Sequence, residues 1–388
     1  MNQTGTILFA GGGTGGHLFP ALAIAEQVVE RSPGTRVRFL CSARPLDAEI
    51  LRAETIGGSP VQFDVVPARP FGVRPMTLMK FLGAWGGAVR AGRRAIAAAK
   101  SERPVWVVAG GGFVAAPVVQ AARAEQVPVL MLNLDAVPGR ANRWISKHAS
   151  KVVTTVEVAG RAKAPPAAGG GTGGTWELIP PIVRRAAVAS APAAECRAAL
   201  GLDPAGPVIF VTGASQGAQS INRLMGALAR KHSEELKRGG WQILHQTGKF
   251  DESALRADYE AAGLKFVIRG FFREMGQAWG AADVAVSRAG AGSVAEAWAN
   301  RVPTVFLPYP YHKDEHQKHN AEPLVRSGGA LLVKDHIDAA KNLEEAGAAV
   351  IELVRSSSKR GAMRAGLAKL GAADGAGRVA GMLVSGAG

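Results

Sequence analysis

The sequence predicts an α/β protein made of two doubly wound parallel sheets, one in each of two domains that face each other across a cleft. Short apolar runs alternate with helical runs along almost the whole chain, which is the pattern of parallel sheets covered by helices on both faces. The strand, glycine-rich loop and helix that begin the chain start again at Pro207. A proline-containing break at Ile179–Arg184 separates the two halves.

The apolar runs locate the strands of both sheets. We expect strands at Thr6–Ala10, Arg36–Cys41, Val61–Val66, Val105–Ala109, Pro128–Leu132, Lys151–Thr155, Pro207–Thr212, Gln242–Gln246, Lys265–Arg269, Asp283–Ser287 and Pro303–Leu307. Residues 1–183 then form an N-terminal domain and residues 184–365 a C-terminal domain. The last segment, residues 366–388, is expected to form a helix that packs back on the N-terminal domain.

Composition narrows the class of protein. The chain has 388 residues, of which 47% are hydrophobic, so it is long enough for two cores and too apolar to be disordered. Cys41 and Cys196 form no disulfide framework, as expected in a reducing compartment.

The chain enters its first strand without a basic and apolar leader, so we expect no signal peptide. The uncharged run 105–122 contains Gly110–Gly112 and Pro117, which favours strand, loop and helix over a membrane span.

The most informative motif is the glycine-rich loop Gly11–Gly16, which follows the first strand and ends at His17. Glycine allows close backbone approach, and free N–H groups at a helix N-terminus bind anions. A histidine beside them can transfer a proton. The loop therefore predicts a phosphorylated or polyhydroxylated ligand. A dinucleotide site is the alternative, but the basic segment Arg36–Arg44 stands where an acidic ribose ligand is expected. A second copy, Gly169–Gly174, has no strand before it and predicts a surface insertion.

Residues 65–103 combine basic with bulky apolar side chains and contain one acid, Glu102. The basic residues are Arg69, Arg74, Lys80, Arg90, Arg93, Arg94, Lys100 and Arg103, and the bulky apolar ones are Phe71, Met76, Leu78, Met79, Phe81, Leu82 and Trp85. Such a segment favours a helix and loop on an anionic membrane surface; a packed helix with a solvated basic face is the alternative. The net charge of +15 also suits nucleic acid, but no RNA- or DNA-binding signature supports that partner, and none is expected.

The second half contains three polar loops. Gly213–Asn222 offers Ser215 and a helix N-terminus to a diphosphate, although a serine there can simply cap the helix. Ser287–Trp298 repeats strand, glycine turn and helix, and its Glu296 can accept two hydrogen bonds from a ribose diol or be a solvated surface residue. The run 308–322 contains three histidines, but it lacks the H-E-x-x-H spacing, so sugar-hydroxyl binding is favoured and no metal is expected.

Seven motifs follow one another in an order typical of one family. They are Gly-Gly-Gly-Thr-Gly-Gly-His-x-x-Pro-Ala-Leu-Ala, Gly110-Gly-Gly-Phe-Val, Val137-Pro-Gly-x-x-Asn142, Thr212-Gly-Ala-Ser-Gln-Gly-Ala…Asn222, His245-Gln-Thr-Gly-Lys249, Arg288-x-Gly-Ala-x-Ser-x-x-Glu296 and His312-Lys-Asp…Gln317…Asn320-Ala. Through them the chain resembles the MurG family of UDP-N-acetylglucosamine transferases over nearly its whole length.

The resemblance implies a GT-B fold and a hexosyltransferase of peptidoglycan synthesis. It implies an inverting transfer of N-acetylglucosamine from UDP-N-acetylglucosamine to lipid I, giving lipid II, without a metal or cofactor. The enzyme would act as a peripheral protein at the cytoplasmic face of the bacterial inner membrane. A related GT-B transferase that uses another UDP-sugar or glycolipid acceptor is the alternative.

The resemblance also implies roles for individual residues. Thr14, Gly15 and Gly16 would lie against the sugar and the acceptor, with His17 as the base. The donor would be held by Arg184, Ser215, Gln216, Gly217, Ala291, Gly292, Ser293, Val294, Ala295, Glu296 and Gln317. Glu296 would bind the ribose and Gln317 the sugar hydroxyls, and backbone near Phe272 would read part of the uracil.

Three positions depart from the family pattern. Asp135 replaces an asparagine whose amide touches the donor sugar, so it is both a candidate sugar contact and a second candidate base. His316 replaces the first of two glutamines. Pro-Pro-Ile-Val, instead of Gly-Asn-Pro-Val, precedes Arg184.

Overall fold

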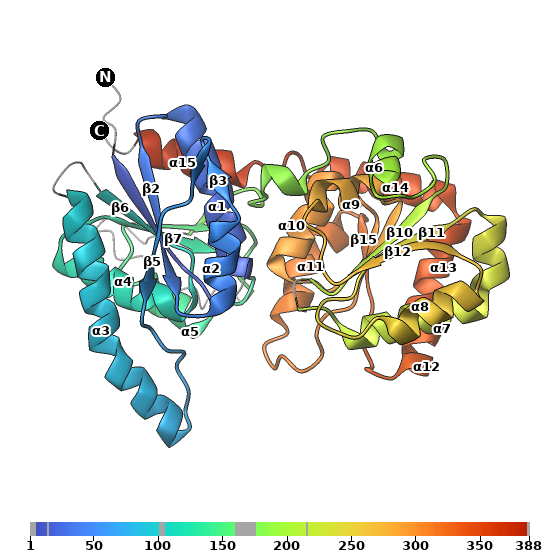
Figure 1. Ribbon diagram of the computed structural model, residues 1–388, viewed down its shortest axis with the longest axis horizontal. Coiled ribbons are helices and arrows are strands. Elements are labelled where there is room, and N and C mark those ends of the chain that lie inside the picture. The colour runs from blue at the N-terminus through green and yellow to red at the C-terminus, as the bar shows by residue number, and fades with distance from the viewer. Residues whose placement is uncertain (1–4, 14, 101–104, 160–175, 215, 386–388) are drawn as a thin grey trace. The chain divides into compact units, whose positions relative to one another are not determined.

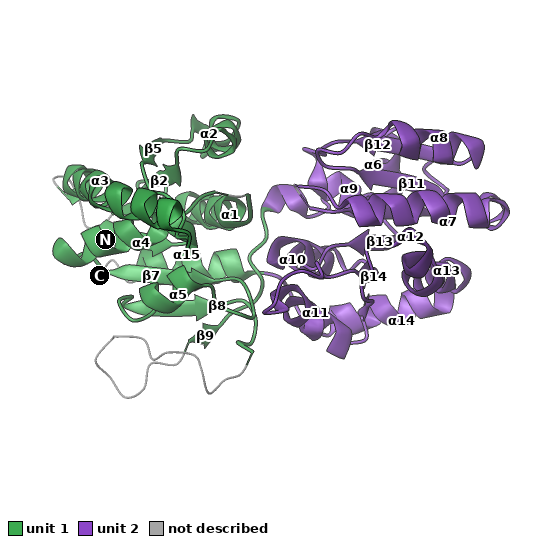
Figure 2. Cartoon of the chain, turned by 90° about the horizontal axis from the view of Figure 1, so that it is seen from below, with its two compact units in different colours: residues 1–184, 374–388 green, residues 185–373 purple. Residues whose placement is uncertain are grey.

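The computed structural model describes residues 5–13, 15–100, 105–159, 176–214 and 216–385 (Figure 1). The chain divides into two compact units, which we describe separately (Figure 2). Unit 1 comprises residues 1–184 and 374–388, and unit 2 comprises residues 185–373. The first boundary lies one residue after the one that the sequence predicts. The predicted terminal segment is divided, because residues 366–373 belong to unit 2 and only the remainder belongs to unit 1.

Within its described residues, unit 1 contains a parallel sheet with the strand order β5-β2-β1-β6-β7-β8-β9. The bounds are β1 (Thr6–Ala10), β2 (Arg36–Ser42), β5 (Phe63–Val66), β6 (Val105–Ala109), β7 (Val129–Asn133), β8 (Lys151–Thr154) and β9 (Glu177–Leu178). A short antiparallel hairpin joins β3 (Thr55–Ile56) to β4 (Ser59–Pro60). Alternate residues of β1 face opposite sides, so Ile7 and Phe9 enter one hydrophobic cluster and Leu8 and Ala10 the other.

Helices cover both faces of this sheet (Figure 1). Their bounds are α1 (Gly15–Arg31), α2 (Pro45–Arg52), α3 (Pro75–Lys100), α4 (Gly112–Ala124), α5 (Arg140–Ile145) and α15 (Gly375–Ser385). α1, α2 and α15 contribute to the cluster on one face, and α3, α4 and α5 to the cluster on the other. α15 packs along α1, so the end of the chain completes the core of the unit in which the chain begins.

Unit 2 repeats this architecture with the strand order β12-β11-β10-β13-β14-β15, again parallel. The strands are β10 (Val208–Thr212), β11 (Gln242–Gln246), β12 (Lys265–Arg269), β13 (Val284–Ser287), β14 (Thr304–Phe306) and β15 (Ala330–Leu332). The helices are η2 (Arg185–Ala187), α6 (Ala193–Ala199), α7 (Gln219–Arg238), α8 (Ser253–Ala261), α9 (Met275–Ala281), α10 (Ala291–Asn300), α11 (His316–Arg326), α12 (Ala339–Asn342), η3 (Leu343–Gly347), α13 (Ala348–Arg355) and α14 (Ser357–Ala368). Both units are therefore Rossmann-like, and the predicted fold class is confirmed.

In each sheet the strand order reverses between two central strands, β1 and β6 in unit 1 and β10 and β13 in unit 2. Ligands of such sheets bind beyond the carboxyl ends of the strands at this reversal. Gly11, Gly110 and Gly213 directly follow β1, β6 and β10, and Gly290 lies three residues after the end of β13. The predicted insertion Gly169–Gly174 lies outside the described residues.

Helix α3 has two different halves. Its buried residues, Ala88, Gly92 and Ile96, all lie in the second half and face α4, whereas Met76, Met79 and Leu82 in the first half are more than 60% exposed. Trp85 is half-buried, and its Nε1 donates to Gln120 Oε1 at 2.6 Å. From Trp85 onward α3 is therefore a packed helix, which was the alternative to a membrane-binding segment. Among the described residues no helix is long and apolar enough to cross a membrane.

Candidate functional site

The glycine-rich loop of unit 1 connects β1 to α1 in a shape that requires glycine. At Gly13, φ is +91°, and an added Cβ would lie 2.7 Å from Phe113 Cε1. Not all of its N–H groups are free, because Gly11 donates to Leu40 O at 3.2 Å and Gly13 to Asp47 Oδ2 at 2.7 Å. The predicted use of this loop as an anion cradle is therefore limited to its other N–H groups. Gly15 and Gly16 begin α1, and Thr14 lies outside the described residues.

His17 is held in one tautomer. Its Nδ1 lies 2.9 Å from Gly110 O, and since a carbonyl oxygen only accepts, Nδ1 carries the proton. In the neutral ring Nε2 then presents its lone pair. A Cβ added at Gly112 would lie 3.3 Å from this nitrogen, so a glycine here leaves room beside it. Burial lowers the pKa of His17 below its usual 6.5, although the nearby Asp135 charge opposes this shift. At neutral pH the ring is uncharged and can accept a proton.

Asp135, the second candidate base, belongs to the same unit and lies in the loop after β7. Its backbone carbonyl accepts from Asn133 Nδ2 at 2.8 Å, and Asn133 Oδ1 accepts from Asn142 Nδ2 at 3.1 Å. Asn133 is fully buried, so this amide chain fixes the loop after β7. The Asp135 charge raises the pKa of His17, which is the interaction that would stabilise an imidazolium after proton transfer. The structure thus brings both candidate bases together.

Arg184, which the resemblance places against the nucleotide sugar, already forms ion pairs with two acids of unit 1. Its Nη2 donates to Glu26 Oε1 at 2.6 Å and its Nη1 to Glu54 Oε1 at 2.7 Å. Only 13% of its side chain is exposed, and the Glu54 and Glu26 carboxylates raise the pKa of the guanidinium although burial opposes them. A phosphate contact from Arg184 would have to replace these two carboxylates.

In unit 2 the loop between β10 and α7 packs against the loop after β11. At Gly217 φ is +72°, and an added Cβ would clash with Thr247 O. Gln246 Nε2 donates to Thr212 Oγ1 at 3.2 Å and to Ala214 O at 3.3 Å, which holds the loop from one side. Gln216 is exposed on this loop, and Ser215 lies outside the described residues.

The N-terminus of α10 is open to a ligand. Its N-cap residue is Gly290, and no side chain caps the helix. A Cβ added at Gly290 or Gly292 would meet no atom within 4 Å, so there is free space beside the backbone of these two glycines. An uncapped helix N-terminus of this kind carries partial positive charge and binds anions. Val294 and Ala295 are buried in the same turn.

Glu296 lies further along α10 and has one side-chain partner that the sequence did not reveal. Trp279 Nε1, on α9, donates to Glu296 Oε2 at 2.8 Å. Burial raises the pKa of Glu296 to about 7, and the indole hydrogen bond opposes this shift only in part. The solvated-residue alternative is therefore wrong, and the carboxyl group changes charge near neutral pH.

Phe272 and Gln317, two further residues predicted to contact the donor, already form hydrogen bonds within unit 2. The Phe272 N–H donates to Gln246 Oε1 at 2.9 Å, and the Phe272 ring is fully buried. Gln317 Oε1 accepts from Tyr309 N at 2.9 Å. Because a backbone N–H only donates, this bond fixes the amide orientation, so the group that Gln317 can offer a sugar hydroxyl is its NH2.

Two of the three histidines of the 308–322 run bind carboxylates. His316 Nδ1 lies 2.8 Å from Asp314 Oδ1, and His319 Nδ1 lies 2.7 Å from Glu322 Oε1. The rings of His312 and His316 contact each other with centroids 4.4 Å apart. In the part of the chain that the structure describes, no group of three or more His, Cys, Asp or Glu residues is placed to hold a metal ion.

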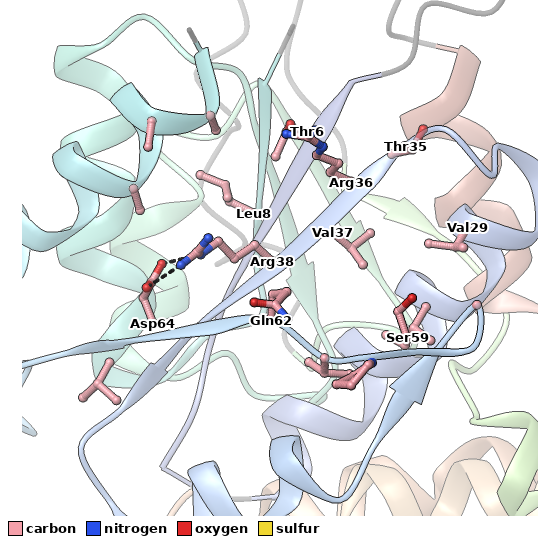
Figure 3. Close-up of a pocket in the computed structure, with 18 of the residues that line it drawn as sticks. Thr6, Leu8, Val29, Thr35, Arg36, Val37, Arg38, Ser59, Gln62 and Asp64 are labelled. Carbon is pink, nitrogen blue, oxygen red and sulfur yellow. Dashed lines mark hydrogen bonds and ion pairs between the residues drawn. The ribbon is translucent and has the colours of Figure 1, made fainter. Parts of the chain in front are cut away.

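A cavity of about 820 Å³ in unit 1 lies at the opposite end of the sheet (Figure 3). It is lined by the first residues of β1, β2 and β5 and by the end of α3. Its Arg38 is paired with Asp64 through two hydrogen bonds of 2.5 and 2.8 Å. The volume of this cavity is that of a ligand pocket, but the reversal of strand order and the groups with shifted pKa values favour a site at the carboxyl ends of the strands.

Comparison with known proteins agrees with that choice. Residues 7–154 match the glycosyltransferase family 28 N-terminal domain and residues 208–379 match the glycosyltransferase family 28 C-terminal domain. The chain belongs to glycosyltransferase family 28. It is 34% identical over 374 residues to the UDP-N-acetylglucosamine–N-acetylmuramyl-(pentapeptide) pyrophosphoryl-undecaprenol N-acetylglucosamine transferase of Desulfotalea psychrophila, covering 96% of this chain and 94% of that protein.

Other relatives agree with this membership. A protein of the same name from Clavibacter michiganensis is 36% identical over 375 residues, covering 96% of this chain and 94% of the relative. The crystal structure of Acinetobacter baumannii MurG is 24% identical, with a TM-score of 0.68 and 99% of each chain covered. This structural likeness supports the GT-B fold of the family 28 chain.

Proposed function

We propose that this family 28 glycosyltransferase transfers N-acetylglucosamine from UDP-N-acetylglucosamine to lipid I, with inversion at the anomeric carbon, to give lipid II. The relatives that carry this activity in their names match almost the whole chain. The structural observation that carries the proposal is the open N-terminus of α10 with Glu296 on the same helix. A nucleotide sugar needs both an anion site and a ribose site at this spacing.

In the donor complex, the N-terminus of α10 faces the diphosphate, together with Ser215, Gln216 and Gly217 of the loop between β10 and α7. Its partial positive charge stabilises the UDP leaving group as the glycosidic bond breaks, which is the role a metal ion has in other transferases. Glu296 accepts hydrogen bonds from the ribose diol, and the NH2 group of Gln317 donates to a sugar hydroxyl. Backbone at Phe272 contacts the uracil, and Arg184 exchanges its carboxylates for phosphate.

In the acceptor half of the site, His17 is the base. Its Nε2 takes the proton from the attacking hydroxyl of the acceptor sugar as that oxygen bonds to the anomeric carbon, and UDP departs from the opposite face. Gly15 and Gly16 allow the acceptor to approach the start of α1, next to Thr14. Asp135 contacts the donor sugar and stabilises the imidazolium that His17 becomes.

The lipid acceptor requires contact with a membrane, and the segment before α3 together with the first half of α3 offers a surface for that contact. Phe71, Val73, Met76, Met79 and Leu82 are 48–76% exposed. Arg69, Arg74 and Lys80 are exposed beside them. Exposed apolar side chains among basic ones bind anionic lipid surfaces. We therefore place the enzyme peripherally at the cytoplasmic face of the inner membrane.

Product formation from UDP-N-acetylglucosamine and a soluble lipid I analogue tests the function. We expect a disaccharide product, and UDP-glucose should give much less of it. No product with UDP-N-acetylglucosamine, but product with a different UDP-sugar, would replace this function by that of a related GT-B transferase.

A further inference from the structure

The glycine-rich loop of unit 1 is held by side chains at the start of helix α2. Gly13 N donates to Asp47 Oδ2 at 2.7 Å, and Gly13 O accepts from Arg44 Nη1 at 2.5 Å. Both polar groups of Gly13 are thus bound by side chains at the start of α2, where Arg44 is the N-cap residue and Asp47 lies in the first turn. We call Ser42, Arg44 and Asp47 the loop clamp. No short motif of the sequence points to Ser42 or Asp47, and Arg44 stands out only as the end of the basic segment Arg36–Arg44.

Asp47 is the central member of the loop clamp. The same Oδ2 also accepts from Ser42 N at 3.0 Å and from Ser42 Oγ at 2.6 Å. A Cβ added at Gly12 would clash with this oxygen, so the carboxylate and two successive loop glycines fit closely together. The loop therefore takes its position from Asp47 on one side and from Phe113 on the other.

Asp47 is unusual for a residue with a purely structural role. It is fully buried, and its Oδ1 has no hydrogen-bond partner among the described residues. An unpaired carboxylate oxygen in the interior lowers stability. An uncharged acceptor in the place of Oδ2 would hold the loop without putting a charge in the interior, so the negative charge itself needs an explanation.

His17 supplies that explanation. It follows the loop that Asp47 holds, and the Asp47 charge acts on the imidazole, favouring its protonated form and opposing the effect of burial. A base must accept a proton during the reaction, and a nearby fixed negative charge stabilises the result. Asp47 is therefore connected to His17 through both backbone geometry and charge.

We propose that Asp47 is a positioning residue of the transfer reaction: its buried carboxylate fixes the glycine-rich loop, and thereby His17, in the orientation that accepts the proton of the acceptor hydroxyl, and its negative charge favours the imidazolium that results. This inference rests on the proposed function, because it assigns His17 as the base. Asp47 touches neither substrate. It acts on the acceptor half of the site and leaves donor binding in unit 2 unchanged.

The test compares Asp47→Asn and Asp47→Ala with Glu49→Gln, a control that removes an exposed carboxylate from the same helix. Asp47→Asn keeps the shape and an accepting oxygen but removes the charge. It should leave UDP affinity unchanged and move the acidic limb of the pH profile of kcat/KM for the acceptor to lower pH, by roughly 0.3–1 unit. Asp47→Ala also frees the loop and should lower kcat/KM by about 10²-fold. Glu49→Gln should behave as wild type.

An NMR titration of the His17 imidazole separates this inference from the proposed function, because it needs no turnover. The His17 midpoint should fall in Asp47→Asn and stay unchanged in Glu49→Gln. If Asp47→Asn retains the wild-type pH profile and the wild-type His17 midpoint, the inference is wrong even though the enzyme makes lipid II. If wild type makes no product while the midpoint still falls, the proposed function fails and the link between Asp47 and His17 remains. Should Asp47→Ala fail to fold, Asp47→Asn decides.

Discussion

Donor affinity should depend on the protonation of Glu296. Burial raises its pKa to about 7 in the nucleotide-free protein, so about a tenth of the carboxyl groups are ionised at pH 6 and about nine-tenths at pH 8. If the ribose diol binds the carboxylate, affinity for UDP-N-acetylglucosamine should increase about tenfold between these pH values, or about 1.4 kcal/mol. Calorimetry with this donor is suitable because its diphosphate, substituted at both ends, does not titrate in this range.

Two controls assign the slope to this carboxyl group. Glu296→Gln should bind the donor more weakly, with an affinity that no longer depends on pH, and a 2′,3′-dideoxyribose analogue of the donor should give the same flat profile with wild type. A flat profile in wild type, or a slope that survives in Glu296→Gln, would refute the ribose assignment.

The same shift predicts an effect on stability. A folded-state pKa above the unfolded value of 4.5 means that the folded protein binds more protons between about pH 4.5 and 7, so this group's contribution to stability is lost as pH rises through that window. Glu296→Gln should therefore raise the Tm of the ligand-free protein at pH 8 by more than at pH 5.5.

Three other outcomes are expected. UDP and UDP-N-acetylglucosamine should stabilise the protein against heat, by about 2.7 kcal/mol at about 100 Kd, whereas NAD should not; stabilisation by NAD alone would favour a dehydrogenase. His17→Ala should lower kcat by about 10²–10⁴-fold with UDP binding preserved, and Asp135→Asn should keep most activity; the reverse result in steady-state assays would make Asp135 the base. Replacing Met79 and Leu82 by Ser should weaken salt-sensitive binding to anionic vesicles without changing donor affinity, and unchanged sedimentation with vesicles would remove α3 from the membrane surface.

The sequence predicts elements well where local pattern decides them. Five-residue apolar strands such as β1 and β11 have the predicted bounds. The short strands β9 and β15 were missed, because two or three residues have no periodicity of their own and become strands only through pairing with β8 and β14. The first half of α3 also could not be separated from the second by composition, since only contact with α4 distinguishes them.

The candidate site divides in the same way. The glycine loops, His17 and Glu296 could be found because their motifs are local. Asp47 could not, because its role depends on a hydrogen bond to Gly13 across 34 residues. The Trp279 partner of Glu296 is on a different helix, and the raised pKa of that carboxyl comes from burial, which no short motif encodes.

The two units show why a glycine-rich loop alone does not reveal its ligand. Each unit places strand, glycine loop and helix at the reversal of its strand order, so the sequence predicts an anion site in both. In unit 1 a buried carboxylate takes the Gly13 N–H, and its negative charge opposes a second anion there while favouring a protonated base. In unit 2 the N-terminus of α10 has no capping side chain, and a Cβ added at Gly290 or Gly292 would meet no atom within 4 Å. We therefore expect the diphosphate of the sugar donor at unit 2 and the proton transfer at unit 1, and this division follows from what binds the loop N–H groups rather than from the glycines themselves.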